Sequence, residues 1–149
     1  MASVLDTVFT IEGAKIFSAA VKTTDLDKTL NTTGNFTIFA PNDRAFTRLS
    51  KIVLAQLSGD IPLLTKILSV HIIPGKLTYL DLLKMCKRGE HTVRLVSIDG
   101  SWVGIDLSDG IKLGGSTVIS TNISTNNGII HLIDRVLIPK FDSKYSVLG

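Results

Sequence analysis

The chain divides into two parts by the spacing of its apolar residues. Over residues 3–85 the apolar positions recur every three or four residues, as they do along one face of a helix. From His91 onward the apolar residues form short alternating runs separated by tight-turn dipeptides, a pattern typical of strands. A helical part followed by a strand part predicts an α+β fold rather than alternating βαβ units.

The predicted helices of the first part begin at side chains that can accept a hydrogen bond from an unpaired backbone N–H. Ser3 and Asp25 suit this role, and Asp60 precedes a proline that favours a helix start. Thr78 with Asp81 has the spacing of a capping box. The expected elements are helices near residues 4–8, 16–21, 26–30, 42–49, 52–57, 61–69 and 78–83, and a strand over residues 36–40.

Glycine dipeptides divide the second part into strands. The hairpin or turn signals are Asp99-Gly100, Asp109-Gly110, Gly114-Gly115 and Asn127-Gly128. The predicted strand side chains between them are Trp102, Val103, Ile105, Leu107, Ile111, Leu113, Val118, Ile119 and Ile123. The last signal precedes residues 127–139, which are rich in Ile and Leu, and therefore predicts a strand buried on much of both faces.

Two distant segments resemble the signature motifs of one protein family. The first, over residues 37–46, reads Thr-Ile-Phe-Ala-Pro-Asn-Asp-Arg-Ala-Phe, so that a buried strand ends at the proline and a capping side chain starts a helix. The second, over residues 127–139, reads Asn-Gly-Ile-Ile-His-Leu-Ile-Asp-Arg-Val-Leu-Ile-Pro. Residues 70–76 match a third segment. On these motifs the chain resembles the fasciclin-type adhesion domain over about residues 3–139, with residues 140–149 as a tail.

The length of 149 residues and the hydrophobic content of 44% indicate a single fasciclin-like domain over residues 1–149. Its expected fold is a β-wedge or sandwich of two sheets, with several short helices packed at one side. The implied function is a non-enzymatic adhesion or binding module that recognises a cell-surface or matrix protein or glycan, secreted or held in a cell-surface or periplasmic location. No cofactor is expected. The alternative is a carrier of a small hydrophobic ligand such as a carotenoid, since the mean hydropathy of +0.34 is high.

The resemblance also marks a set of motif residues as candidate binding positions with largely structural roles. These are Thr37, Phe39, Pro41, Asn42, Asp43, Phe46, His71, Pro74, Asn127, Gly128, His131 and Asp134. His71 stands between two apolar residues in a predicted strand, which indicates a buried ring bonded to nearby polar groups. Val70 stands where the family often has a tyrosine, and the missing hydroxyl argues against integrin-type recognition through this segment.

Enzymatic and metal chemistry find little support. The three histidines lack the close spacing of metal ligands, and His91 is expected to face solvent. The chain has no nucleophile elbow, no Walker loop and no dinucleotide-binding glycine motif. The single cysteine, Cys86, excludes an internal disulfide and is expected to be a small buried hydrophobe at a helix end.

Charge and targeting signals bear on possible partners and on the location of the protein. The net charge of +3 arises within residues 1–90, with a cluster at Lys84, Lys87 and Arg88 that we interpret as solvated surface, or alternatively as a contact for an acidic polymer or a lipid headgroup. This pattern does not favour nucleic-acid binding. We expect no membrane span and no signal peptide in this chain. Acceptor triplets for N-glycosylation begin at Asn31, Asn35 and Asn122.

Overall fold

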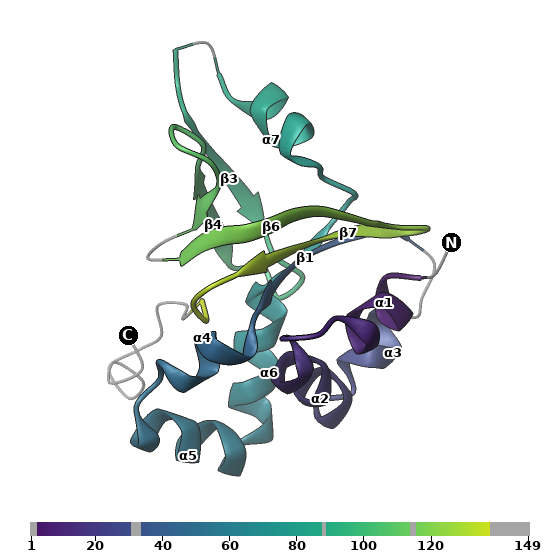
Figure 1. Cartoon of the computed structure of the whole chain (residues 1–149), viewed down its shortest axis with the longest axis vertical. Helices are drawn as coiled ribbons and strands as arrows, with labels where there is room; N and C mark the ends of the chain where they lie inside the picture. Colours follow the sequence, from purple (N-terminus) through teal and green to yellow (C-terminus); the bar gives the residue numbers. More distant parts are fainter. Residues whose placement is uncertain (1–2, 31–33, 88, 114–115, 138–149) are drawn as a thin grey trace.

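The computed structural model describes residues 3–30, 34–87, 89–113 and 116–137 (Figure 1). Several expectations lie outside these residues. They are the glycosylation triplet at Asn31, the basic residue Arg88, the Gly114-Gly115 turn, the end of the strand predicted over residues 127–139, and the tail over residues 140–149. The side chain of Asn122 is also outside the description.

The strands form two sheets that share one long strand, as the predicted β-wedge requires. The described residues give a seven-stranded order of β2-β1-β7-β6-β5-β4-β3, in which only β1 and β7 pair in parallel. The start of β6 pairs with β5 and the rest pairs with β7, and two register shifts interrupt the pairing of β6 with β7. The bounds are β1 Phe36–Pro41, β2 Ile72–Pro74, β3 Thr92–Val96, β4 Trp102–Asp106, β5 Lys112–Leu113, β6 Ser116–Thr125 and β7 Gly128–Ile133.

Helices cover the β1–β7 pair on one side, and the second sheet covers the other (Figure 1). The helices are α1 Val4–Thr10, α2 Lys15–Thr23, α3 Leu26–Leu30, α4 Asp43–Thr47, α5 Lys51–Gly59, α6 Ile61–Val70 and α7 Tyr79–Met85. The first six lie on the helical side, whereas α7 lies beside β3 on the opposite side. Ile38 and Ile130 face the helical core, and Phe39 and Ile133 face the core between the sheets. The predicted α+β class is confirmed.

Most predicted helix starts are confirmed by a capping bond. Asn42 Oδ1 accepts a hydrogen bond from Ala45 N at 2.8 Å, and Asp60 Oδ1 accepts one from Leu63 N at 3.0 Å. The Thr78 capping box is present in both directions, because the Thr78 hydroxyl and the carboxylate three residues later each accept a backbone N–H. These bonds satisfy donors that the first turn of a helix would otherwise leave unpaired.

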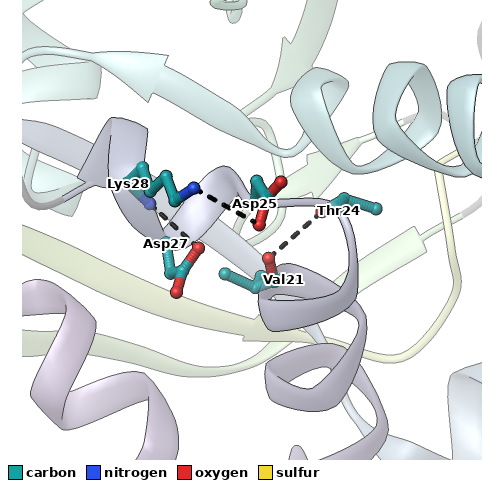
Figure 2. A network of polar contacts seen from close by, with 5 residues as sticks. All are labelled: Val21, Thr24, Asp25, Asp27 and Lys28. Atoms are coloured by element: carbon teal, nitrogen blue, oxygen red, sulfur yellow. Dashed lines mark hydrogen bonds and ion pairs between the residues drawn. The ribbon is translucent and has the colours of Figure 1, made fainter.

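Asp25 plays a different part from the predicted cap (Figure 2). Its φ of 60° turns the chain sharply between α2 and α3, and its carboxylate lies 4.0 Å from the Lys28 ammonium. The Thr24 hydroxyl closes α2 by donating to the Val21 carbonyl at 3.2 Å, and Asp27 Oδ1 accepts the Lys28 N–H at 3.0 Å. Since both charged side chains are exposed, local backbone geometry rather than the ion pair sets this junction.

His71 does not lie in a strand, contrary to the prediction. It is the C-cap of α6, with a helical φ of −84° and ψ of −3°, and β2 begins at the next residue. Its ring bonds the Ile67 carbonyl one turn earlier, which holds residue 71 in the helical conformation. The apolar pattern alone could not distinguish the last residue of a helix from the first residue of a strand.

The final strand is shorter than predicted, because side chains take over its hydrogen bonds. β7 ends at Ile133, and the Asp134 carboxylate then accepts the backbone N–H of Thr117 at 2.8 Å. The Arg135 N–H donates to the hydroxyl of Ser116 at 3.1 Å instead of to a neighbouring strand. The two segments stay side by side without a regular ladder.

Gly128 is required for close packing and not for a turn, which corrects the prediction from Asn127-Gly128. The turn consists of residues 126 and 127, and Gly128 is already the first residue of β7, paired with Thr125. A Cβ atom at position 128 would lie 2.1 Å from the Phe36 carbonyl oxygen, a distance that no real Cβ adopts. The parallel pairing of β1 with β7 therefore depends on a missing side chain.

No single helix in the described parts of the chain is both long and apolar enough to cross a membrane. Helices α5 and α6 reach that length and composition only together, and they meet at a bend of 108°.

We predict that Gly128→Ala destabilises the protein by about 3 kcal/mol or more, because the Phe36 carbonyl and β1 must move away. The matched control is Gly104→Ala in β4, where an added Cβ meets nothing within 4 Å and the φ is not positive. That control should be neutral or more stable by up to about 1 kcal/mol. Urea denaturation of both variants measures the difference. Equal midpoints would show that β1 and β7 do not approach closely at Gly128.

Candidate functional site

The first motif places Thr37 and Phe39 on the same face of β1, a strand that is buried on both faces. The Thr37 hydroxyl donates to the Gly75 carbonyl at 2.7 Å and accepts the Leu77 N–H at 2.8 Å. It therefore fixes the loop that leaves β2. Phe39 stacks on the ring of His131, which stands beside it in the parallel register, with centroids 5.3 Å apart and planes inclined by 21°.

His131 joins three segments through its two ring nitrogens. Nε2 lies 3.0 Å from the Leu77 carbonyl oxygen, and Nδ1 lies 2.7 Å from the Thr121 hydroxyl. A carbonyl can only accept, so the neutral ring donates from Nε2 and accepts at Nδ1. Burial lowers the pKa of His131, although the bond to Leu77 acts in the opposite direction. The ring is an uncharged link between β7, β6 and the segment before α7.

His71 makes a second link of the same kind, with the predicted burial and the predicted bonds to backbone. Its Nδ1 lies 2.8 Å from the Ile67 carbonyl oxygen, and its Nε2 accepts the Leu137 N–H at 2.8 Å. The ring is fully buried, and burial lowers its pKa from 6.5 to about 4. A proton on Nε2 would point at the Leu137 N–H, so this geometry also requires the neutral ring.

The acidic and amide motif residues tie neighbouring elements together. Asp43 Oδ1 accepts the Ile16 N–H at 2.8 Å, which supplies the cap that Ala14 cannot give to α2. Asn127 Oδ1 accepts the Val4 N–H at 2.7 Å and so holds α1 against the turn before β7. Pro41 ends β1, as predicted.

The other motif residues take three kinds of position. Phe46 is buried in the helical core, Pro74 is exposed at the end of β2, and Asp134 binds the start of β6. The motifs thus bring the buried residues together around β1 and β7, where most of their polar groups already have internal partners. A direct role of these residues in binding stays a prediction.

Side chains suited to holding a metal ion do not converge in the part of the chain that the structure describes. Across the described ranges, no three side chains of His, Cys, Asp or Glu approach closely enough to hold a metal ion. His91 is exposed, as predicted. Cys86 is only half buried, which corrects the expectation of a buried residue, and its Sγ lies 3.7 Å from the Leu82 carbonyl oxygen. It ends a short helix whose last turn is open to solvent.

The clearest exposed feature is the outer surface of β3 and β4, which we call the Trp102 face and define as Thr92, Arg94, Val96, Trp102 and Gly104. Both strands alternate between exposed and buried positions, and these five residues point outward. Trp102 is 67% exposed, and the Arg94 guanidinium carbon lies 6.0 Å from its ring centroid. The sequence pattern predicts Trp102 only as a strand residue, without an exposed position. Its alternation with buried Val103 and Ile105 was the signal that could have placed it outside.

Three small hollows can be described from the residues that line them. One of about 220 Å³ separates α7 from β6 and is lined by Tyr79, Ile111 and Ile119 among others. A second of about 270 Å³ lies over Gly104 on the Trp102 face. A third of about 370 Å³ runs between the end of α7 and β3. Pockets for small organic ligands span roughly 300–1,000 Å³, so these volumes reach only the lower end.

The family model of the fasciclin domain matches residues 12–139. The chain belongs to the fasciclin family. The match includes both signature motifs and all the strands that the structure describes, β1 to β7.

Two similar proteins differ greatly in length. An uncharacterized protein of Synechocystis sp. is 33% identical over 138 residues, which are 93% of this chain and 98% of that protein. Human periostin is 32% identical over 139 residues, which are 92% of this chain but only 16% of periostin. The fasciclin domain of this chain thus resembles nearly the whole of one relative and a small part of the other.

A solved structure shares the fold. It is a domain pair from the insect cell adhesion molecule Fasciclin I, with a TM-score of 0.75 and 19% sequence identity. The match covers 99% of this chain and 53% of that chain, which is the share expected if one domain of the pair is matched.

We predict that acid destabilises this fasciclin domain between pH 6.5 and about 4, because the unfolded chain binds a proton at His71 that the folded state excludes. Stability at this site is complete above pH 6.5 and falls by about 3 kcal/mol as the pH drops to 4. His131 adds a loss of the same sign, since its pKa is also lowered.

Denaturant melts across this pH range test the prediction through the slope of stability against pH. His71→Gln should reduce the slope whatever it does to the absolute stability, and the matched change at the exposed His91 should leave the slope unaltered. If His71→Gln keeps the slope of the parent, His71 is not the group that acid protonates on unfolding.

Proposed function

We propose that this chain is a non-enzymatic adhesion or binding module that recognises a cell-surface or matrix component, either protein or glycan. Membership of the fasciclin family supports the proposal, and so does the name of the insect protein with the matching fold, a cell adhesion molecule. We also propose that the chain acts outside the cell, in a secreted, cell-surface or periplasmic location, by the same reasoning.

The observation that carries the proposal is the exposed pair of Trp102 and Arg94. Tryptophan and arginine are the residues most enriched in the energetic centres of protein interfaces. Trp102 leaves most of its ring in water, and Val96, directly across from it on β3, is 42% exposed. Covering this area with a partner would remove apolar surface from water, and the guanidinium would supply directional hydrogen bonds.

The carrier alternative is favoured by the hollow between α7 and β6. Tyr79, Ile111 and Ile119 give it apolar walls. Leu80, the residue after Tyr79 on α7, is 57% exposed. Its volume of about 220 Å³ is below that of a typical small-molecule pocket, so adhesion remains the leading function. An absorption spectrum of the protein purified from its native source tests for a bound pigment.

We predict that Trp102→Ala weakens binding to a cell-surface or matrix component by about tenfold or more, because an exposed anchor side chain is lost from the interface. The assay is surface binding of the purified protein to immobilised matrix proteins and to a glycan array, with a thermal melt of each variant.

The matched control is Ile52→Ala on α5, because Ile52 is 69% exposed and lies on the helical side of the molecule. It should leave binding unchanged, and both variants should melt close to the parent. Equal losses in the two variants, or none in either, would show that the Trp102 face is not the contact surface.

A further inference from the structure

The two edges of the sheet are protected to different degrees. At one edge β2 has only three residues and ends at Pro74, which has no N–H to offer. The Ile72 carbonyl on this edge already accepts the Ile98 N–H at 3.0 Å. At the other edge β3 has five residues. Short length, a proline and an existing bond block strand addition at β2, and none of the three applies along β3.

The pairing of β3 with β4 defines which backbone groups face the open edge. The Ser97 N–H donates to Ser101, and the Leu107 N–H donates to His91. His91 and Ser97 flank β3 on either side, and both are odd-numbered. Because hydrogen-bonded pairs alternate along an antiparallel ladder, Val93 and Leu95 also point their backbone groups at β4. The even-numbered residues therefore point theirs outward.

The outward backbone groups are those of Thr92, Arg94 and Val96. Ile98 continues the same alternation, and its N–H is the one that reaches β2. The β2 edge and the chain after β3 therefore meet at Ile98, and β3 itself lies apart from β2. Within the described ranges, no group bonds the outward N–H and carbonyl groups of these three residues.

The third hollow described above, of about 370 Å³, lies beside this open edge, and we call it the slot. It is lined by residues from the end of α7 to β3: Met85, Lys87, Glu90, Thr92, Val93 and Arg94. A strand lying there would place alternate side chains toward the buried side, near Val93, and toward the outer side, near Arg94. Main-chain pairing and two rows of side-chain contacts would then act together.

The charges around the slot favour an acidic occupant. Lys87 and Arg94 of the lining are exposed, and among the described residues neither of them forms an ion pair. Glu90 is the acidic residue of the lining, so basic groups outnumber acidic ones. A second copy of the chain fits less well, because antiparallel pairing of two β3 strands centred on Arg94 would place like charges opposite each other.

We propose that the β3 edge takes up an extended, acidic segment of a partner protein by strand addition. The proposal rests on the proposed binding function and specifies a partner class for it. Thr92, Arg94 and Val96 supply the main-chain bonds, and Lys87 and Arg94 attract the acidic side chains.

The test uses a fluorescent peptide of alternating glutamate and valine, about seven residues long, and follows its binding to the full chain by fluorescence polarisation. Two control peptides separate the contributions. One has lysine in place of glutamate, which reverses the charge. The other keeps every side chain but carries N-methyl groups on alternate amides, which removes the donors for strand pairing. We expect both controls to bind at least about tenfold more weakly than the parent peptide.

Variants of β3 test the same contacts from the protein side. Thr92→Pro removes an outward N–H at a position where an edge strand tolerates proline, and Thr92→Val is the matched control that keeps it. We expect about a tenfold loss for the first and no loss for the second. Amide hydrogen exchange on the parent protein adds a readout that needs no variant. Binding should slow exchange at Thr92, Arg94 and Val96, while the ladder amides of Val93 and Leu95 are slow throughout.

Three results would overturn the proposal. They are equal binding of the N-methylated and parent peptides, absence of peptide binding up to about 1 mM, and self-association of the chain that Thr92→Pro abolishes, which would make a second copy the occupant. If the chain still binds a matrix protein or glycan through Trp102, only the strand-addition proposal fails and the proposed function stands.

Discussion

The fold depends on burying the parallel pair of β1 and β7 between two layers. Side chains on both faces of these strands are removed from water, with helices on one side and the second sheet on the other. A strand in that position cannot use solvent to satisfy a polar group, so each polar group must find a partner inside the protein. Among the described residues, every buried side-chain nitrogen and oxygen has such a partner. Gly128 also makes this burial possible, since β1 and β7 can approach each other only because residue 128 has no Cβ.

This constraint explains why the two buried histidines are well suited to their positions. A neutral imidazole carries a donor and an acceptor at opposite sides of a flat ring, so it can link two segments that no strand pairing joins. His71 links the end of α6 to Leu137, and His131 links Thr121 to Leu77. The same bonds require the uncharged form, which makes the packing of the wedge sensitive to acid.

Because most motif residues serve the interior of the fold, the second sheet offers the exposed side chains suited to a partner. β3 and β4 are covered on one face only, so their outer residues can vary without disturbing either core. Trp102 and Arg94 lie there, and the adjoining edge of β3 has outward backbone groups without a partner among the described residues. The Trp102 face and the β3 edge meet at Arg94. One region of the molecule can therefore contact a partner through both side chains and backbone groups.

Elements that rest on local chemistry could be predicted from the sequence alone. Caps at Asn42, Asp60 and Thr78 follow from side chains that reach backbone groups within one turn, and the change of apolar period separates helices from strands. The α+β class followed from the same local patterns, whereas the family resemblance rested on the motifs at residues 37–46 and 127–139.

Contacts between residues distant in sequence became apparent only in the folded chain. The role of Gly128 depends on the Phe36 carbonyl, which lies more than ninety positions earlier in the chain, and His71 ends a helix while bonding Leu137 far beyond it. The early end of β7 depends on Ser116 and Thr117, and the open edge of β3 depends on where β2 and α7 pass. Apolar periodicity reports which residues are buried, but it carries no information about which buried segments face each other, because that choice is made by packing the whole chain at once.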